Sequence, residues 1–241
     1  MIEGYGWRSA YQLFAALILL VSLPLALFVL REAPTERVGA SVPPATGLRN
    51  REAARTRNYW LVLSSFLLVG VGITSVLSHL VPMLLDRGMS LSSAARCMST
   101  LAVALIFGRI IAGFLMDHFF APWVTAGFIV FGLAGGVALL AMGATGGWAF
   151  LAAALVGLAT GSEISEIAFI VGRYFGQLSF GQIYGIMFGA FQLGSAVAAP
   201  MMGYYFDRVG DYTGALWCVA GLALVGALLV AVMSPYPEKW A

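Results

Sequence analysis

Long runs of apolar residues, separated by short polar turns, fill most of this chain. Seven of these runs are long enough to cross a bilayer as a helix, which takes about 20 apolar residues. None shows the short alternating segments that are typical of membrane strands. The seven predicted spans are Ala10–Leu30, Leu61–Leu85, Ala94–Met116, Trp123–Met142, Trp148–Gly172, Ile183–Tyr205 and Thr213–Met233. The pattern therefore predicts an all-α, polytopic bundle of transmembrane helices in a lipid bilayer.

The composition agrees with a membrane protein and excludes several other classes. The chain is 61% hydrophobic and 10% charged, whereas soluble domains carry about 25% charged residues. Its net charge is only +2, and its basic residues follow the loops, so no nucleic-acid partner is expected. Cys97 and Cys218 both fall within predicted spans, where they are expected to pack as small core residues. We therefore expect no disulfide, no metal site and no cofactor.

The connections between the spans define four segments. Residues 1–30 hold the first span, residues 31–58 a linker, residues 59–234 a six-helix half, and residues 235–241 a tail. Because the turns within the six-helix half are short, its successive helices should run antiparallel. The linker differs, since it carries six arginines and three prolines, which is typical of a flexible, water-exposed segment.

The distribution of basic residues predicts the orientation in the cell membrane. If the linker is cytoplasmic, nine lysines and arginines fall on that side and four on the other. Without Arg109, which lies inside a span, the balance is still eight against four. Cytoplasmic loops carry the excess of positive charge. The linker and the C-terminus are therefore predicted to be cytoplasmic, and the N-terminus outside.

A weak internal repeat relates two halves of the bundle. The sequence Gly-Phe-Leu-Met-Asp closes the third span at residues 113–117, and Gly-Tyr-Tyr-Phe-Asp closes the sixth at residues 203–207. Antiparallel threading places the first copy at the cytoplasmic face and the second at the outer face. Spans two to four and five to seven would then be inverted three-helix repeats, an arrangement that recurs in secondary transporters.

Several motifs carry a resemblance to a known family. The stretch Gly108–Asp117 resembles the loop-eight motif of major facilitator superfamily transporters. Three further stretches, 173–176, 184–185 and 203–214, resemble the family's tenth to twelfth helices, and the branch most like this chain is that of the monocarboxylate and oxalate/formate carriers. The resemblance implies that the chain corresponds to helices six to twelve of a twelve-helix fold. It also implies a secondary transporter that moves a small organic anion by alternating access, with a monocarboxylate as the leading candidate.

The chain departs from that family pattern in two respects. The family's first five helices are absent, and the loop motif lacks the usual basic residues after Asp117. Three alternatives therefore stay open: a truncated half without function, one subunit of a split carrier that needs a missing N-terminal half, and a facilitator for sugars or drugs. An enzyme is not expected, because the sequence contains no Gly-x-Ser-x-Gly, no His-Glu-x-x-His and no Cys/His cluster. A retinal protein is disfavoured, because the single lysine lies in the tail.

Arg109 is the candidate substrate-binding residue. A permanent charge this deep in a span costs at least about 2.5–3.5 kcal/mol, so it should face a cavity or a partner. Its planar fork suits a carboxylate, and the resemblance implies a substrate arginine at a similar place. The alternatives are snorkelling towards the cytoplasm or a structural pair with Asp117. Gln192 is expected to add a polar contact in the same cavity, or to form a hydrogen bond between helices.

Glu163 and Glu166 are the candidates for proton coupling. Their i,i+3 spacing places both on one face of the fifth span. Two close carboxylates in a low dielectric do not both ionise readily, so one is expected to hold a proton. The alternative is a structural ion pair between Glu166 and Arg173, seven residues later on about the same face.

The remaining charged positions are assigned to gating or structure. Asp117 is expected to belong to a cytoplasmic gating contact. The other residues expected to make gating or structural contacts are Arg173, Asp207 and Arg208.

Overall fold

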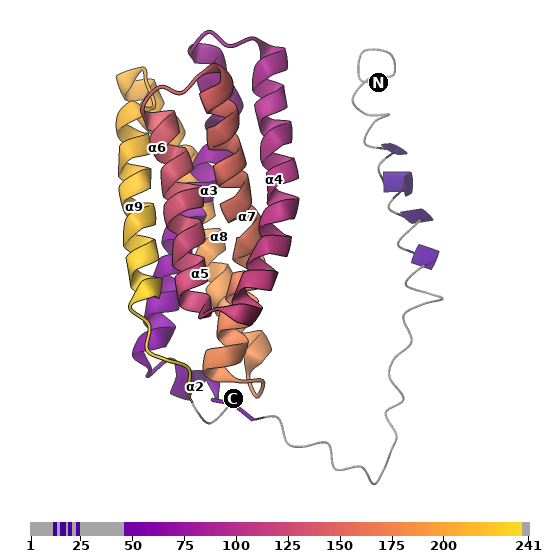
Figure 1. The fold of residues 1–241 in the computed structure, drawn as a ribbon, viewed down its shortest axis with the longest axis vertical. Helices are drawn as coiled ribbons and strands as arrows, with labels where there is room; N and C mark the ends of the chain where they lie inside the picture. The colour runs from indigo at the N-terminus through magenta and orange to yellow at the C-terminus, as the bar shows by residue number, and fades with distance from the viewer. Residues whose placement is uncertain (1–11, 14, 18, 21–22, 25–45, 238–241) are drawn as a thin grey trace. The chain divides into compact units, whose positions relative to one another are not determined.

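The computed structural model describes residues 46–237, together with 12–13, 15–17, 19–20 and 23–24. The predicted first span, Ala10–Leu30, lies for the most part outside the described residues. The elements of the described part are α2 (Asn50–Ala53), α3 (Arg57–Asp86), α4 (Leu91–His118), α5 (Ala121–Gly127), the π-helix η1 (Phe128–Ala134), α6 (Gly135–Ala141), α7 (Gly146–Phe175), α8 (Phe180–Val209) and α9 (Thr213–Ala231). They form an antiparallel helical bundle (Figure 1).

Six helical segments in this part are long and apolar enough to cross a membrane. They coincide with the six predicted spans of the half and extend most of them at both ends. The exceptions are the predicted ends at Met142 and Met233, since α6 stops at Ala141 and α9 at Ala231. The prediction of an all-helical membrane bundle is confirmed.

One span contains a feature that the hydrophobic pattern did not indicate. The segment predicted as a single helix is α5, η1 and α6 in succession, so a π-helix occupies its centre. Gly132 lies within η1, and a Cβ there would come within 2.9 Å of the Ala159 Cβ on α7. The wider turn therefore lies where this span is pressed against α7.

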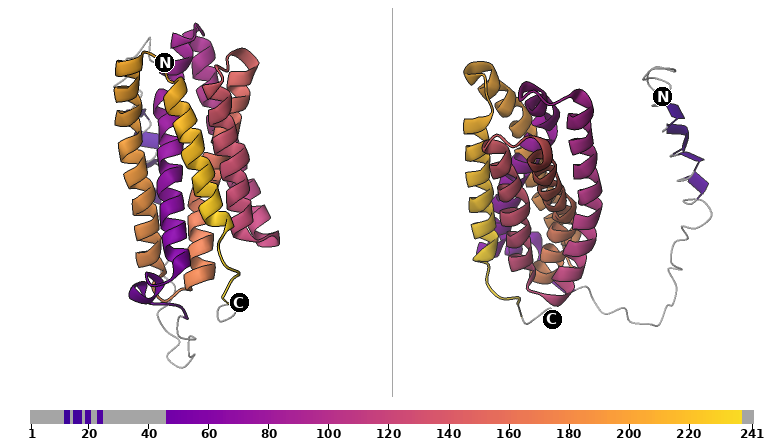
Figure 2. Two further views of the ribbon diagram at one scale, coloured as in Figure 1. Left: turned by 90° about the vertical axis from the view of Figure 1, so that its left-hand side faces the viewer. Right: turned by 45° about the horizontal axis from the view of Figure 1, so that its top comes forward.

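The helices pack in two equivalent pairs. Helix α4 packs mainly against α7, and α3 packs mainly against α8, while α5–η1–α6 and α9 lie outside these pairs. Figures 1 and 2 show α9 and α4 at opposite edges of the bundle. If the first three spans are exchanged with the last three, α4–α7 becomes α8–α3. The two three-helix repeats are thus related as the sequence repeat predicted.

Glycines allow the backbones of each pair to approach closely. On α7, a Cβ at Gly157 or Gly161 would overlap a carbonyl oxygen of α4, that of Leu101 or Leu105. In the other pair, Gly194 of α8 faces the Leu67 carbonyl in the same manner. Small residues that bring helix backbones together are a common basis of helix association in membranes. The Gly157–Gly161 spacing therefore fixes the α4–α7 crossing.

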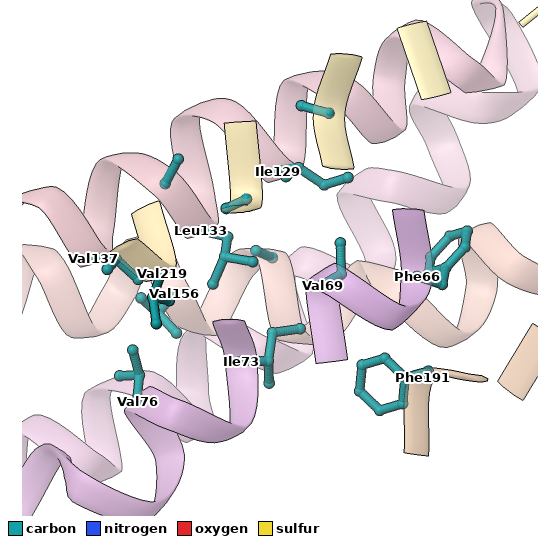
Figure 3. Close-up of a cluster of buried hydrophobic side chains, with 14 of the residues drawn as sticks. Phe66, Val69, Ile73, Val76, Ile129, Leu133, Val137, Val156, Phe191 and Val219 are labelled. Carbon is teal, nitrogen blue, oxygen red and sulfur yellow. The ribbon is translucent and has the colours of Figure 1, made fainter. Parts of the chain in front are cut away.

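An apolar cluster fills the centre of the bundle. Figure 3 shows Ile73 and Val76 of α3 in a cluster with Leu133 of η1, Val156 of α7 and Val219 of α9. All five side chains are buried. The described charged side chains that are buried, Glu163 and Glu166, both belong to α7.

Residues 46–58, which the composition assigns to the flexible linker, are folded. Gly47 pairs with Gly176 in an isolated antiparallel bridge, in which the Leu48 N–H donates to the Phe175 carbonyl at 2.8 Å. A Cβ on Gly47 would lie 2.6 Å from the Phe175 oxygen, and φ is +151° at Gly47 and +75° at Gly176. Two facing glycines therefore anchor the end of the linker to the α7–α8 turn.

Candidate functional site

The α4–α7 pair carries the charges that lie deep in the described bundle. Glu163 and Glu166 of α7 are 5% and 2% exposed, and Arg109 of α4 is exposed. The Arg109 and Glu163 side chains are near enough for their charges to interact, and so are the two glutamates. Arg109, Glu163 and Glu166 therefore belong to one region of the α4–α7 pair, although no ion pair in the described part of the chain joins the arginine to either glutamate.

The two carboxyl groups are poorly satisfied within the chain. Glu163 Oε2 and Glu166 Oε1 are buried without a hydrogen-bond partner. The Ser162 hydroxyl lies beside Glu166 and donates to the Ala159 carbonyl at 2.9 Å. Burying an ionised carboxylate without partners is far more costly than burying its protonated form. This environment can therefore hold a proton on the pair.

Gln192 lies on a different part of the surface. It is exposed on α8, which packs mainly against α3 rather than against α4. The same face of α8 carries Gly185 and Gly189, where an added Cβ would meet no described atom within 4 Å. Small and polar residues thus line an uncovered face of α8, but no recorded contact joins Gln192 to Arg109 within the described part.

Arg173 does not form the ion pair with Glu166 that its spacing suggested. Its guanidinium carbon lies 5.5 Å from the centre of the Phe169 ring and 5.7 Å from that of the Tyr236 ring. The Tyr236 hydroxyl accepts from the Ala121 N–H at 2.8 Å, and burial raises the pKa of this phenol above its ordinary value. Arg173 is therefore held by aromatic rings at the end of α7.

A cavity of about 560 Å³ adjoins Arg173. Its lining residues are Thr46, Ser165, Ala168, Phe169, Gly172, Arg173, Gly176, Gln177 and Phe180. No sequence pattern indicates this cavity, because its walls come from the linker end, α7 and the start of α8.

The aspartates of the sequence repeat lie at opposite ends of the bundle. Asp117 is exposed near the end of α4, and Asp207 is exposed near the end of α8. Arg208 stacks on its own helix, with its guanidinium carbon 4.9 Å from the centre of the Tyr204 ring. The structure thus places these residues at the mouths of the bundle and not beside Arg109.

A polar contact of His79 ties α3 to α8 and to the α8–α9 turn, and the position of this histidine near the outer end of its span predicts that a backbone carbonyl holds it. His79 Nε2 lies 3.1 Å from the Ala199 carbonyl oxygen, and His79 Nδ1 lies 3.4 Å from the Tyr212 hydroxyl. Tyr212 also stacks on Phe206, with ring centres 4.4 Å apart.

Helices that traverse a membrane in two inverted repeats define a protein of the secondary-transporter type. The chain belongs to the Major Facilitator Superfamily, because the sequence pattern of that family matches residues 1–188. This is a family of membrane transporters and not of enzymes. In the described residues, no group of three or more His, Cys, Asp or Glu side chains could hold a metal ion.

Known relatives agree with this assignment. Monocarboxylate transporter 11 of Homo sapiens is 26% identical over 238 residues, which cover 95% of this chain and 50% of that protein. Monocarboxylate transporter 12-B of Danio rerio is 26% identical over 269 residues, which cover 95% of this chain and 54% of that protein. The chain therefore spans about half the length of the curated relatives that it matches.

A solved structure shares the fold. The crystal structure of the E. coli fucose:proton symporter FucP matches with a TM-score of 0.64 and 23% sequence identity, over 93% of this chain and 54% of that one. The arrangement of helices is thus that of the superfamily.

Proposed function

We propose that this chain forms one wall of a secondary active transporter that moves a small organic anion by alternating access. The leading candidate for this anion is a monocarboxylate. The observation that carries the proposal is the position of Arg109, exposed on α4 and within electrostatic reach of the buried Glu163. A guanidinium binds a carboxylate through two parallel hydrogen bonds. The similarity to two monocarboxylate transporters supports the same substrate class.

Proton coupling follows from the same cluster. A proton on Glu163 or Glu166 removes the negative charge that competes with the substrate for Arg109. Loss of the proton restores this competition and favours release of the anion. The pair thus links substrate binding to protonation, because Arg109 interacts with the substrate carboxylate or with an ionised Glu163.

The opposite wall of the substrate cavity is assigned to helices outside this sequence. Helices α4 and α8 are the least buried of the six spans, with 22% and 33% of their most apolar windows buried, compared with 61% for α7. Their uncovered faces carry Arg109 and Gln192. Helices that cover these faces, from the same polypeptide or from a separate partner, would enclose both side chains in one cavity.

In the proposed orientation, the linker and the tail lie in the cytoplasm. The α3–α4 turn lies on the outer side of the membrane. Residues 46–58 and the tail lie at the same end of the bundle, where the Ser234 N–H donates to Asn58 Oδ1 at 3.4 Å. That end carries Arg49, Arg51, Arg55 and Arg57. The positive-inside rule assigns such an end to the cytoplasm.

The experiment is uptake of radiolabelled lactate, formate, oxalate and L-fucose into proteoliposomes. The 241-residue chain is compared with the same chain supplied with the missing helices of the opposite wall. Uptake of lactate or formate, but not of fucose, by the supplemented protein would support the proposal. Uptake of fucose alone would replace the anion with a sugar, and uptake by the 241-residue chain alone would show that it assembles a carrier by itself.

Proton coupling is tested in the same vesicles with an inward proton gradient. Glu163→Gln and Glu166→Gln each keep the size of the side chain but cannot carry a proton. We expect at least one of them to abolish the stimulation of lactate uptake by external acid. If both variants respond to the gradient as the unmodified protein does, neither glutamate carries the coupling proton.

A further inference from the structure

The cavity beside Arg173 runs along α7 from the depth of the two glutamates to the cytoplasmic end of the helix. Ser165, which lines its inner end, lies between Glu163 and Glu166 in sequence, and Arg173 lies eight residues later. A helix rises about 1.5 Å per residue, so these two lining residues are roughly 12 Å apart along the axis. The cavity thus spans the distance from the level of the candidate site to the end of the bundle.

The lining of this cavity favours a small anion. Arg173 is its single charged residue, and no Asp or Glu is present among the nine lining residues. Ser165, Gln177 and Thr46 add polar side chains, and Phe169 and Phe180 add apolar walls. A hydroxyl and an amide can each donate a hydrogen bond to a carboxylate.

The aromatic contacts of Arg173 leave its hydrogen-bonding edge available. Its guanidinium carbon lies over the rings of Phe169 and Tyr236, 5.5 Å and 5.7 Å from their centres, in a cation–π arrangement that uses no hydrogen bond. The five N–H donors lie in the plane of the group and project from its edge. The described residues provide no recorded ion pair for this arginine, and its side chain is exposed.

The rim of the cavity is fixed by the linker. Thr46 belongs to the lining, and its carbonyl accepts from the Gln177 N–H at 2.8 Å. The adjoining bridge between Gly47 and Gly176 fastens the linker end to the turn that carries Gln177. The rim of the cavity is therefore held in place by tertiary contacts between segments that are about 130 residues apart in sequence.

We propose that this cavity is a cytoplasmic vestibule with a second, weaker site for the carboxylate of the transported anion, in which Arg173 binds the anion between the cytoplasm and Arg109. The inference rests on the proposed function, because it uses the same substrate class. It assigns Arg173 to substrate passage and not to an ion pair with Glu166. The residue acts by concentrating anions at the mouth, as a positively lined cleft does for a charged substrate.

The test measures access of charged thiol reagents to the inner end of the cavity. In protein whose native thiols are removed by Cys97→Ala and Cys218→Ala, Ser165→Cys places one thiol on the lining. Its rate of modification from the cytoplasmic face is measured with an anionic and a cationic methanethiosulfonate, in the transporter with both walls present. The ratio of the two rates reports the local potential and is insensitive to changes in the width of the cavity.

We expect Arg173→Gln to lower the ratio of the anionic to the cationic rate by roughly threefold, since one unit charge about 12 Å away in a hydrated cavity changes the two rates in opposite directions. Arg173→Lys keeps the charge and should keep the ratio. The matched control is Arg96→Gln, which removes an arginine near the start of α4, at the opposite end of the bundle from Arg173. An unchanged ratio in Arg173→Gln, or an equal fall in Arg96→Gln, would overturn the proposal.

A transport measurement separates this inference from the proposed function. From the cytoplasmic face, Arg173→Gln should raise the KM for lactate several-fold and leave the maximal rate intact, whereas Arg109→Gln should also lower the maximal rate. If the thiol ratio falls in Arg173→Gln but Arg109→Gln transports lactate normally, the vestibule stands and the assignment of the substrate site fails. If Arg109→Gln behaves as expected but the ratio is unchanged, the vestibule alone fails.

Discussion

The two helix pairs of the bundle share a backbone arrangement but differ in the chemistry that they carry. The α4–α7 pair holds Glu163 and Glu166, and the positions 90 residues earlier on α3, within the equivalent α3–α8 pair, are Ile73 and Val76. All four side chains are buried. Ile73 and Val76 belong to the apolar cluster of Figure 3, whereas each glutamate leaves one carboxyl oxygen without a partner.

The difference shows which requirements belong to the fold and which do not. Because α3 packs against α8 with apolar residues at these positions, the packing of two repeats does not need carboxylates there. A buried carboxyl group without a partner lowers stability. The two glutamates should therefore lower the stability of the bundle, which is the pattern expected of a functional site inside a membrane.

The largest expected effect is on stability when the two pairs exchange their chemistry. Val76→Glu places a carboxyl group in the apolar cluster and should lower the free energy of unfolding by about 3 kcal/mol or more. Glu166→Val should leave it unchanged or raise it. Thermal unfolding of detergent-purified protein measures both. Equal destabilisation by the two substitutions would mean that Glu166 has a structural role.

The next effect should be common to both pairs, because each relies on close backbone contact. Gly161→Ala brings a Cβ against the Leu105 carbonyl, and Gly194→Ala does the same at Leu67. Each should cost about 2–3 kcal/mol through overpacking. Gly185→Ala, where the added Cβ meets no described atom, is the control and should have no measurable cost. A tolerant Gly161 would show that α4 can move away from α7 without loss of stability.

A smaller effect in energy, but a large one in transport, is expected at Arg109. Replacement by glutamine removes charge-assisted hydrogen bonds that contribute about 1.5–3 kcal/mol, which corresponds to a loss of roughly 10- to 150-fold in kcat/KM for lactate. Arg109→Lys should lose less, and Arg96→Gln should transport normally. Initial rates in proteoliposomes decide this. Normal transport by both Arg109 variants would exclude the residue from substrate binding.

The smallest effect is expected at the end of the bundle where residues 46–58 and Tyr236 lie. Tyr236→Phe leaves the Ala121 N–H without its acceptor and should cost about 1 kcal/mol. Burial raises the pKa of Tyr236, although the hydrogen bond from Ala121 opposes the shift. The stability that Tyr236 adds over phenylalanine should therefore be present below the ordinary tyrosine pKa of about 10 and fall as the pH rises above it, because the phenol ionises first in the unfolded chain. Unfolding measured at pH 7 and pH 11 tests the sign, with the exposed Tyr204→Phe as the control. A cost that does not change with pH would contradict it.

The spans and the inverted repeat could be predicted from the sequence, because hydrophobic length and turn spacing determine them directly. The π-helix of η1 could not, since it leaves no periodic signal in the hydrophobic pattern. Residues 46–58 were predicted as flexible linker from their arginines. Their order comes from the bridge between Gly47 and Gly176, which are 129 residues apart.

The candidate site was predicted in part. Hydrophobic context alone identifies Arg109, Glu163 and Glu166, because charges are rare inside spans. Helical spacing also suggested a pair between Glu166 and Arg173, but spacing carries no information about Phe169 and Tyr236, whose rings hold the guanidinium instead. Tyr236 comes from the tail, which only the folded chain brings to the end of α7.

The most direct test of the central claim is equilibrium binding of lactate and of its neutral amide, lactamide, to the purified transporter with and without Arg109→Gln. The two ligands have nearly the same shape, and only lactate carries a carboxylate. The account predicts that the unmodified protein binds lactate at least tenfold more tightly than lactamide, and that Arg109→Gln removes this preference. Equal binding of the two ligands, or a preference that survives Arg109→Gln, would contradict it.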